Sequence, residues 1–266
     1  GVRLVGSEMC IRDRNMMPFP ESFPVPLIYI EETDSTNHYL NDLCNKQDVS
    51  ELTTVVANYQ TLGRGQRGNS WESKKGKNLI FSFVLYPTSL EIRRQFLLSQ
   101  IISLSIKEEL DTYVKDISIK WPNDIYWKER KICGILIEND LMGVHISQSI
   151  AGIGININQE EFFSPAPNPV SLKQITGQTY ELSGILAGVM QRIIEYYSLL
   201  QKGEHTYITH RYQKALFRKE GMHKYSDANG EFIARTIEVE ADGHLVLQDD
   251  TGKIRRYVFK EVQHIL

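Results

Sequence analysis

The sequence predicts an α+β fold in which helices flank a mixed β-sheet and a small β-sheet domain follows at the C-terminus. Up to about residue 218, β-branched apolar segments alternate with segments whose apolar residues recur with helical spacing. Beyond Arg218 the pattern changes to short alternating strands separated by glycines, which is typical of antiparallel sheet. Over 266 residues, 41% hydrophobic content is enough for a real core. We therefore expect one domain over residues 27–218 and a second over residues 219–266.

Composition excludes several classes of protein. The 30 Lys+Arg against 33 Asp+Glu give a net charge of −3, which does not suit a protein that coats nucleic acid. Three cysteines without a CxxC pair indicate neither a disulfide framework nor a thiolate zinc site, so we expect a reducing, cytoplasmic setting. The seven histidines have no metal-ligand spacing, and no apolar run approaches the roughly 18 residues of a membrane span. We expect no protein-held metal and no membrane contact.

Residues 1–26 are expected to be a non-native or disordered leader and entry segment. The first fifteen residues carry charge without an apolar run and lack the order of a secretory signal. Met16 and Met17 follow, and we expect the natural start near Met16. No folded DNA-binding unit fits into so short a segment, so we expect no DNA binding.

The expected elements of the first domain follow in order from its periodicity. A strand begins at Leu27. A helix is expected after Ser35, which suits its N-cap, because Tyr39, Leu40 and Leu43 follow with helical spacing. Pro122 cannot continue a strand, so a turn is expected at residues 122–124. The other expected elements are strands over residues 52–59 and 78–86, a helix over 91–113, strands over 117–121, 131–138 and 144–158, and helices over 183–201 and 204–214.

Residues 60–77 form a long basic, glycine-rich loop, and long ordered loops are usually functional. Gly63 to Gly68 satisfies GxGxxG, which could indicate a dinucleotide site. However, no helix pattern follows the third glycine, and a dinucleotide oxidoreductase is therefore disfavoured. The loop is better explained as a flexible anion cradle, in which Arg64 and Arg67 supply charge and Trp71 a flat stacking face. A solvated basic loop is the plain alternative.

Three further clusters carry polar residues at strand ends. The turn places Asn123 and Asp124 where they can face a cleft, and Lys131 opens an apolar strand at the rim of the sheet. Gly154 allows close approach of a ligand. The side-chain amide of Asn156 can both donate and accept hydrogen bonds at the polar edge of that ligand. Taken singly, each cluster is also explained by a strand end that reaches water.

Together these segments resemble the ordered motif series of bacterial biotin protein ligases of the monofunctional type, without a DNA-binding domain. The series is Ser35-Thr36-Asn37, Gln60, GRGQRGNSW from Gly63, KWPND from Lys120, RKICGIL from Arg130 and GIGIN from Gly152. The resemblance covers about residues 27–266. It implies a catalytic domain of the class II aminoacyl-tRNA synthetase and biotin ligase type, followed by a Src-homology-3-like β-barrel.

The resemblance also implies a two-step reaction. Biotin is activated with ATP and Mg²⁺ to biotinyl-5'-AMP and pyrophosphate, and the biotinyl group then passes to a lysine of a biotin carboxyl carrier domain. The implied catalytic residues are Lys131 and Arg64. The implied biotin-binding residues are Ser35, Thr36, Asn37, Gln60, Gly63, Arg64, Gly65, Gln66, Lys131 and Gly134. The implied ATP-binding residues are Arg64, Arg67, Trp71, Lys120, Asn123, Lys131 and Asn156.

Several expectations complete this interpretation. From its turn position, Asp124 is a catalytic candidate that orients or deprotonates the carrier lysine. Gln66 and Asn69 stand where many relatives carry basic residues, so adenylate retention is expected to be weaker. A lipoate protein ligase and a non-catalytic biotin-sensing regulator remain the alternatives. An exposed strand could pair two copies into a homodimer.

Overall fold

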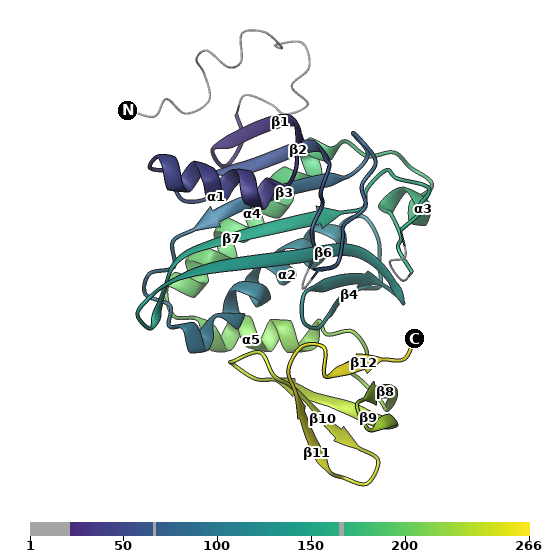
Figure 1. The fold of residues 1–266 in the computed structure, drawn as a ribbon. Helices are drawn as coiled ribbons and strands as arrows, with labels where there is room; N and C mark the ends of the chain where they lie inside the picture. The colour runs from purple at the N-terminus through teal and green to yellow at the C-terminus, as the bar shows by residue number, and fades with distance from the viewer. Residues whose placement is uncertain (1–21, 66–67, 165–167) are drawn as a thin grey trace.

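The computed structural model describes residues 22–65, 68–164 and 168–266. The expected leader, residues 1–26, lies mostly outside the described part, as do Gln66 and Arg67 of the basic loop. Figure 1 shows a large sheet with helices on both faces and a smaller sheet formed by the C-terminal part of the chain.

The large sheet has seven strands in the order β1-β2-β3-β7-β6-β5-β4. Its first two strands are parallel, and all other neighbours are antiparallel, so the sheet is mixed as predicted. The strands are β1 Leu27–Thr33, β2 Thr54–Gln60, β3 Leu79–Leu85, β4 Ile117–Lys120, β5 Asp124–Trp127, β6 Arg130–Met142 and β7 His145–Ile155.

Helices cover both faces because the central strands alternate apolar side chains between two cores. On β3, which is buried throughout, Phe81 and Phe83 belong to the main core, whereas Val84 belongs to a small core with Leu40. Helix α1 (Thr36–Lys46) packs on the face of the small core. On the opposite face, α2 (Phe96–Leu110) contacts α4 (Leu182–Gln201) and α5 (His205–Lys214).

Some expected boundaries differ from the observed ones. The helix expected over residues 91–113 is a 3₁₀ turn at Ile92–Arg94 followed by α2, and the strand expected over 144–158 ends at Ile155. The turn after β4 occupies residues 121–123, so Asp124 is the first residue of β5 rather than part of the turn. Two short elements, β5 and α3 (Leu172–Thr176), were not predicted, because four or five residues give no clear periodicity.

The C-terminal sheet has five antiparallel strands in the order β11-β10-β9-β8-β12. They are β8 His223–Asp227, β9 Gly230–Val239, β10 Leu245–Asp249, β11 Ile254–Tyr257 and β12 Val262–His264. Gly230, Gly243 and Gly252 have positive φ at the turns between them, which glycine adopts without steric cost. A C-terminal β-sheet domain is thereby confirmed.

The two sheets share one apolar core. Tyr225 and Leu245 of the small sheet belong to the same buried cluster as Phe83 and Ile101 of the large domain. The Trp121 indole Nε1 donates a hydrogen bond to the Gly243 carbonyl oxygen at 2.8 Å. No helix among the described residues is long and apolar enough to cross a lipid bilayer.

Candidate functional site

A small cavity of about 110 Å³ opens where α1, the basic loop and strands β5, β6 and β7 meet. Four aliphatic side chains form part of its wall: Ile80, Ile135, Leu136 and Ile153. The other lining residues are polar, charged or small, apart from two aromatic side chains: Ser35, Thr36, Asn37, Gln60, Arg64, Gly65, Asn69, Ser70, Trp71, Asn123, Asp124, Lys131, Gly134, Gly152, Gly154 and Phe259. A cavity that combines aliphatic side chains with placed polar groups can hold a small organic molecule that has both kinds of surface.

One end of this cavity carries a hydrogen-bonded group of uncharged side chains. The Thr36 backbone N–H donates to Gln60 Oε1 at 2.8 Å, which fixes the direction of that amide. The buried Ser82 hydroxyl lies 2.7 Å from Thr36 Oγ1 and 2.6 Å from Asn37 Oδ1. Asn37 Nδ2 donates to Glu138 Oε2 at 2.7 Å. This end is suited to a neutral head group that both donates and accepts hydrogen bonds.

Two glycines of β7 make room for the side chains that form the site. A Cβ on Gly154 would overlap the Trp71 indole, and a Cβ on Gly152 would overlap the Asn37 amide. Gly134 on β6 also lies directly beside the Trp71 ring. The small residues of the GIGIN and RKICGIL segments therefore permit Trp71 and Asn37 to lie flat against the sheet.

A second, larger cavity of about 820 Å³ adjoins the first. It lies between the basic loop, β4, the loop after β7 and the C-terminal strand β12. Its lining residues are Gly68, Asn69, Ser70, Trp71, Glu72, Lys120, Trp121, Pro122, Asp124, Tyr126, Lys131, Asn156, Phe162, Ser164, Asn168, Pro169, Phe259, Lys260, Val262, Gln263, His264 and Leu266. Its size suits a nucleotide better than the small cavity does.

The two cavities meet at an ion pair. Lys131 Nζ lies 2.7 Å from Asp124 Oδ1 and 5.7 Å from the centre of the Trp71 ring, and all three residues line both cavities. The Lys131 backbone is fixed by hydrogen bonds to Asn168 O and from Val170 N, at 2.8 and 2.9 Å. An ammonium held at this junction can contact an anion in either cavity at the same time.

A second cation lies deeper in the larger cavity. Burial lowers the pKa of Lys120, with Lys131 and Arg218 adding to the effect and Asp124 opposing it. Its Nζ donates to the Tyr126 hydroxyl at 3.3 Å. A partly desolvated ammonium interacts strongly with an anionic ligand because little water screens it.

Two buried polar atoms at the larger cavity have no hydrogen-bond partner within the described chain. They are the Trp71 Nε1 and the Asn156 Oδ1, on residues that both line this cavity. Buried polar atoms are almost always paired in folded proteins. Because both residues line the larger cavity, a ligand bound there could supply the missing partners after a small shift of either side chain.

The basic loop is tied to the loop after β7 through Glu72. Its carboxylate accepts hydrogen bonds from the backbone N–H of Phe163 at 2.9 Å and of Ser164 at 2.5 Å, and from Gln159 Nε2 at 3.2 Å. These two loops form adjacent walls of the larger cavity. Glu72 thus fixes the position of one wall relative to the other.

Most of the predicted site residues come together here. Ser35, Thr36, Asn37, Gln60, Arg64, Gly65 and Gly134 line the small cavity; Lys120 and Asn156 line the larger one; Trp71, Asp124 and Lys131 line both.

Asn123, expected beside ATP, lines the small cavity, and its Nδ2 donates to the Ile135 carbonyl oxygen. Arg64, expected at both ligands, lines only the small cavity. Gly63 lines neither, but its carbonyl oxygen accepts from Trp71 N at 2.9 Å. Gln66 and Arg67 lie outside the described residues.

Sequence reasoning missed Ser82, Glu72 and Phe259 as parts of the site. Ser82 is a lone serine in an apolar strand, and Phe259 lies more than a hundred residues beyond the last motif. Neither position has a local pattern that could reveal it. Glu72 directly follows Trp71, but only the fold brings Phe163 next to it.

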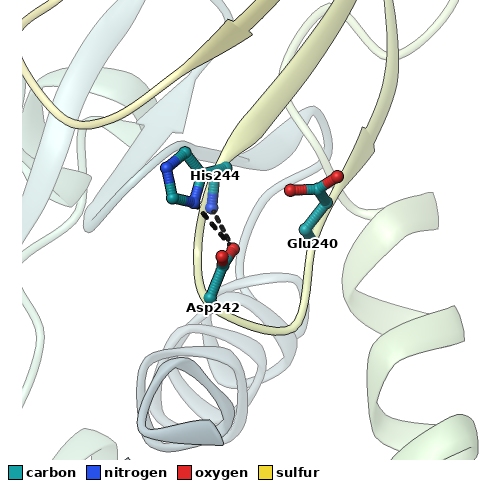
Figure 2. A group of neighbouring side chains, drawn as sticks. All are labelled: Glu240, Asp242 and His244. Carbon is teal, nitrogen blue, oxygen red and sulfur yellow. Dashed lines mark hydrogen bonds and ion pairs between the residues drawn. The ribbon is translucent and has the colours of Figure 1, made fainter. Parts of the chain in front are cut away.

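Away from the cavities, Glu240, Asp242 and His244 group at the turn between β9 and β10 (Figure 2). His244 Nδ1 lies 2.8 Å from Asp242 Oδ1. Arg256 pairs with both carboxylates, lying 2.8 Å from Asp242. Because this guanidinium already neutralises the acids, the group is explained as an ion-pair cluster that stabilises the turn.

Comparison with known proteins relates the site to one family. Residues 29–156 match the Biotin/lipoate A/B protein ligase family. The bifunctional ligase/repressor BirA of Bacillus subtilis is 29% identical over 237 residues, covering 85% of this chain and 70% of that protein. The biotin--[acetyl-CoA-carboxylase] ligase of Paracoccus denitrificans is 26% identical, covering 85% and 91%.

A solved structure is similar over nearly the whole chain. The biotin protein ligase of Aquifex aeolicus, determined in complex with biotin and ATP, has a TM-score of 0.76 and 28% identity. The match covers 91% of this chain and all of that one. The α+β architecture with a C-terminal sheet is therefore that of biotin protein ligases.

Proposed function

We propose that this chain is a biotin protein ligase, because residues 29–156 match the Biotin/lipoate A/B protein ligase family and the similar proteins over most of the chain are biotin ligases. It activates biotin with ATP and transfers the biotinyl group to a lysine of a carrier domain. The sequence predicted a ligase that binds biotin and ATP. This agrees with the names of the relatives and with the two ligands in the Aquifex structure.

One observation supports this function above the others: two cavities of different size meet at Lys131. Biotin has an apolar ring system, a neutral urea head and a terminal carboxylate, which suits the small cavity with its head at Gln60 and Thr36. Its carboxylate then lies at Lys131. ATP suits the larger cavity, with its adenine near Trp71 and Asn156 and its phosphates toward Lys120 and Lys131.

In the first step, a biotin carboxylate oxygen attacks the α-phosphorus of ATP. A new P–O bond forms, the bond to the β-phosphate oxygen breaks, and pyrophosphate leaves. Both reactants are anions, so catalysis requires their alignment and fixed positive charge between them. The Lys131 ammonium supplies that charge where the two cavities join, and Asp124 orients it.

In the second step, the carrier lysine amine attacks the carbonyl carbon of biotinyl-5'-AMP. An amide bond forms, the bond to the phosphate oxygen breaks, AMP leaves, and the amine loses a proton. Asp124 lines both cavities and is our candidate for receiving that proton.

Magnesium enters as part of the MgATP substrate. Two carboxylates line the larger cavity within the described residues, and both are engaged, Asp124 with Lys131 and Glu72 with backbone N–H groups. This fits a cation held mainly by phosphate oxygens and water, as Mg²⁺ commonly is at nucleotide sites.

Intact-mass analysis of a carrier domain incubated with biotin, ATP and Mg²⁺ tests the function. The wild-type protein should add one biotinyl group to the carrier, with release of pyrophosphate. Lipoate supplied in place of biotin should not drive that release, because lipoate lacks the urea that the polar end of the cavity suits. Binding of biotin without pyrophosphate release would instead indicate a biotin-sensing regulator.

We further propose a cytoplasmic setting and a possible homodimer. Cys44 and Cys133 are free thiols, consistent with a reducing compartment. Strand β1 is one edge of the large sheet and could join the same edge of a second copy, whereas β4, the other edge, is already hydrogen-bonded to Ala215 and Phe217. Sedimentation at several concentrations with and without biotin and ATP measures that association.

A further inference from the structure

His264 is a histidine of strand β12 that lines the larger cavity from the C-terminal sheet. Its ring contacts two aromatic rings, whose centroids lie 4.8 Å away for Tyr225 and 5.4 Å away for Phe217. The strand is held in place by its pairing with β8 and by Arg218 Nη1, which donates to the Ile265 carbonyl oxygen at 2.6 Å. The imidazole therefore has a fixed position in the cavity wall.

The charges that act on His264 are cationic. Burial lowers the pKa of His264 to about 3, and Lys120 of β4, Arg218 after α5 and His223 of β8 act in the same direction. Within the described residues, no hydrogen bond or ion pair joins a His264 ring nitrogen to another group of the chain. The free protein thus holds a neutral imidazole beside positive charge, and its ring nitrogens are left for a ligand.

The acidic groups nearby do not neutralise this end of the larger cavity. The carboxylates on β5, on the turn after it and on β8 already have cationic partners: Asp124 pairs with Lys131, Glu129 with Arg218, and Asp227 with Arg255. The Tyr126 and Tyr225 phenols are uncharged at neutral pH, because burial raises the pKa of each. Lys120 has no carboxylate within ion-pair distance among the described residues. This end of the cavity therefore carries positive charge that a bound anion would neutralise.

We propose that His264 contacts the triphosphate of ATP and takes up a proton when MgATP binds, an inference that rests on the proposed ligase function. A nucleotide whose adenine lies near Trp71 extends its phosphates toward Lys120, and His264 lines the same cavity. The negative charge of the phosphates offsets the cations that keep the imidazole neutral in the free protein. The resulting imidazolium donates from both ring nitrogens, which suits it to phosphate oxygens.

This protonation gives His264 a part in the first step of the reaction. Negative charge builds up on the pyrophosphate as its bond to the α-phosphorus breaks, and an imidazolium beside those oxygens stabilises that charge. After the pyrophosphate has left, the cations again oppose the charged form of His264, and the ring gives its proton to water. One proton is therefore taken up when MgATP binds and is released when the pyrophosphate departs.

Binding calorimetry in two buffers of different ionisation enthalpy measures this proton uptake. The α,β-methylene analogue of ATP, which cannot release pyrophosphate, is titrated into wild type and His264→Gln with Mg²⁺ and biotin present. Glutamine keeps an N–H donor but cannot take up a proton, and protons bound by the analogue itself count equally in both proteins. If the phosphates restore the pKa of His264 to 6.5, wild type should bind about one proton more than the variant at pH 5.5 and almost none more at pH 8.

The pH dependence of the KM for ATP gives a second measurement. Because the ATP complex holds the extra proton, the affinity of wild type for ATP should rise as the pH falls. The factor by which His264→Gln raises the KM for ATP should therefore be about tenfold larger at pH 5.5 than at pH 8, while the KM for biotin stays within about twofold.

His244→Gln is the matched control. His244 belongs to the same sheet, lies 2.8 Å from Asp242 at the turn between β9 and β10 (Figure 2), and lines neither cavity. This substitution should change neither the proton uptake nor the KM for ATP. A change equal to that of His264→Gln would show that the effect does not belong to the cavity.

Equal proton uptake by wild type and His264→Gln at both pH values would overturn the inference. A KM for ATP raised by the same factor at pH 5.5 and pH 8 would also overturn it, because that pattern indicates a purely structural role. NMR of the His264 ring needs no variant, and its signal should titrate at a higher pH with the analogue bound than in the free protein. Failure of wild type to release pyrophosphate from ATP and biotin would instead refute the proposed function.

Discussion

At the scale of single residues, the site depends on Lys131 and the carboxylate that holds it. The Asp124–Lys131 pair is partly buried, with the two side chains 20% and 24% exposed. A pair in such a position is fixed in direction more firmly than one on the open surface, and it still has access to a ligand. The charge of Lys131 is therefore available at one defined point between the two cavities.

Lys131→Ala should reduce adenylate formation by about 10²- to 10³-fold, because an aligned charge at the reacting anions is lost. Pyrophosphate release with saturating biotin and ATP measures this step. Lys128→Ala is the control, since Lys128 is exposed and its ammonium lies over Trp127, away from both cavities. Equal rates for Lys131→Ala and wild type would refute the role of Lys131.

Asp124→Asn should slow both steps. Loss of the ion pair leaves Lys131 free to move, so adenylate formation should fall about tenfold, and transfer should fall further if Asp124 also receives the amine proton. Single-turnover transfer from preformed biotinyl-5'-AMP separates the steps. Unchanged transfer would limit Asp124 to orienting Lys131.

The sequence predicted those site residues that occur in compact polar segments. Lys131, Trp71 and Ser35 belong to such segments and do line the cavities. Ser82 was not predicted, because a serine in a β-strand becomes informative only when its neighbours across the sheet and on α1 are known. Asn123 lines the small cavity, so its predicted contact with ATP stays a prediction.

At the scale of elements, the walls of the larger cavity are two loops joined by Glu72. Glu72→Ala should release the loop after β7 from the basic loop, since three hydrogen bonds to the carboxylate are lost. Biotinyl-5'-AMP should then dissociate several-fold faster, and the Phe163 and Ser164 amides should exchange hydrogen faster. The exposed Glu161→Ala is the control. Unchanged exchange in Glu72→Ala would show that Glu72 does not hold the loop.

Strand β12 contains a histidine that makes stability depend on pH. Burial lowers the pKa of His264 to about 3, and the nearby Lys120, Arg218 and His223 act in the same direction. The unfolded chain binds a proton at this residue near pH 6.5, but the folded chain resists it until about pH 3, so stability is lost as pH falls between these values.

His264→Gln removes this titration. The fall in the free energy of unfolding between pH 7 and pH 4 should then be smaller by about 3 kcal/mol than in wild type. Urea unfolding at a series of pH values measures the difference. Parallel curves for the two proteins would show that His264 titrates alike in both states.

The long elements were predictable because their apolar periodicity continues for several turns or strand repeats. Strand β3 and helix α4 were both predicted within a residue or two of their bounds. The helix expected over residues 91–113 was predicted to begin too early. The segment before α2 contains a 3₁₀ turn at Ile92–Arg94, which the apolar spacing did not distinguish from α-helix. Strand β5 is recognised by its pairing with β4 and β6, which local sequence does not encode.

At the scale of the whole molecule, the C-terminal sheet is part of the site and of the core. Phe259 lines both cavities, and Trp121, which is 7% exposed, contacts the Phe259 ring and bonds to Gly243. We therefore expect the two sheets to unfold together, with coincident transitions by circular dichroism and calorimetry.

Trp121→Phe should lower the free energy of unfolding by about 1 to 3 kcal/mol, because the Gly243 carbonyl loses its donor and a space opens between the sheets. Trp127→Phe, on the partly buried strand β5, is the control and should cost less. Two separate transitions in wild type would show that the sheets fold independently.

Trp71 has a consequence for how the reaction can be followed. Its indole lies between the two cavities with an unpaired Nε1, so each ligand changes its surroundings differently. In a variant with Trp121 and Trp127 replaced by phenylalanine, Trp71 is the sole tryptophan. The fluorescence of Trp71 would then change when biotin binds, when ATP binds and when the product is released. Each event would give its own signal from one natural fluorophore.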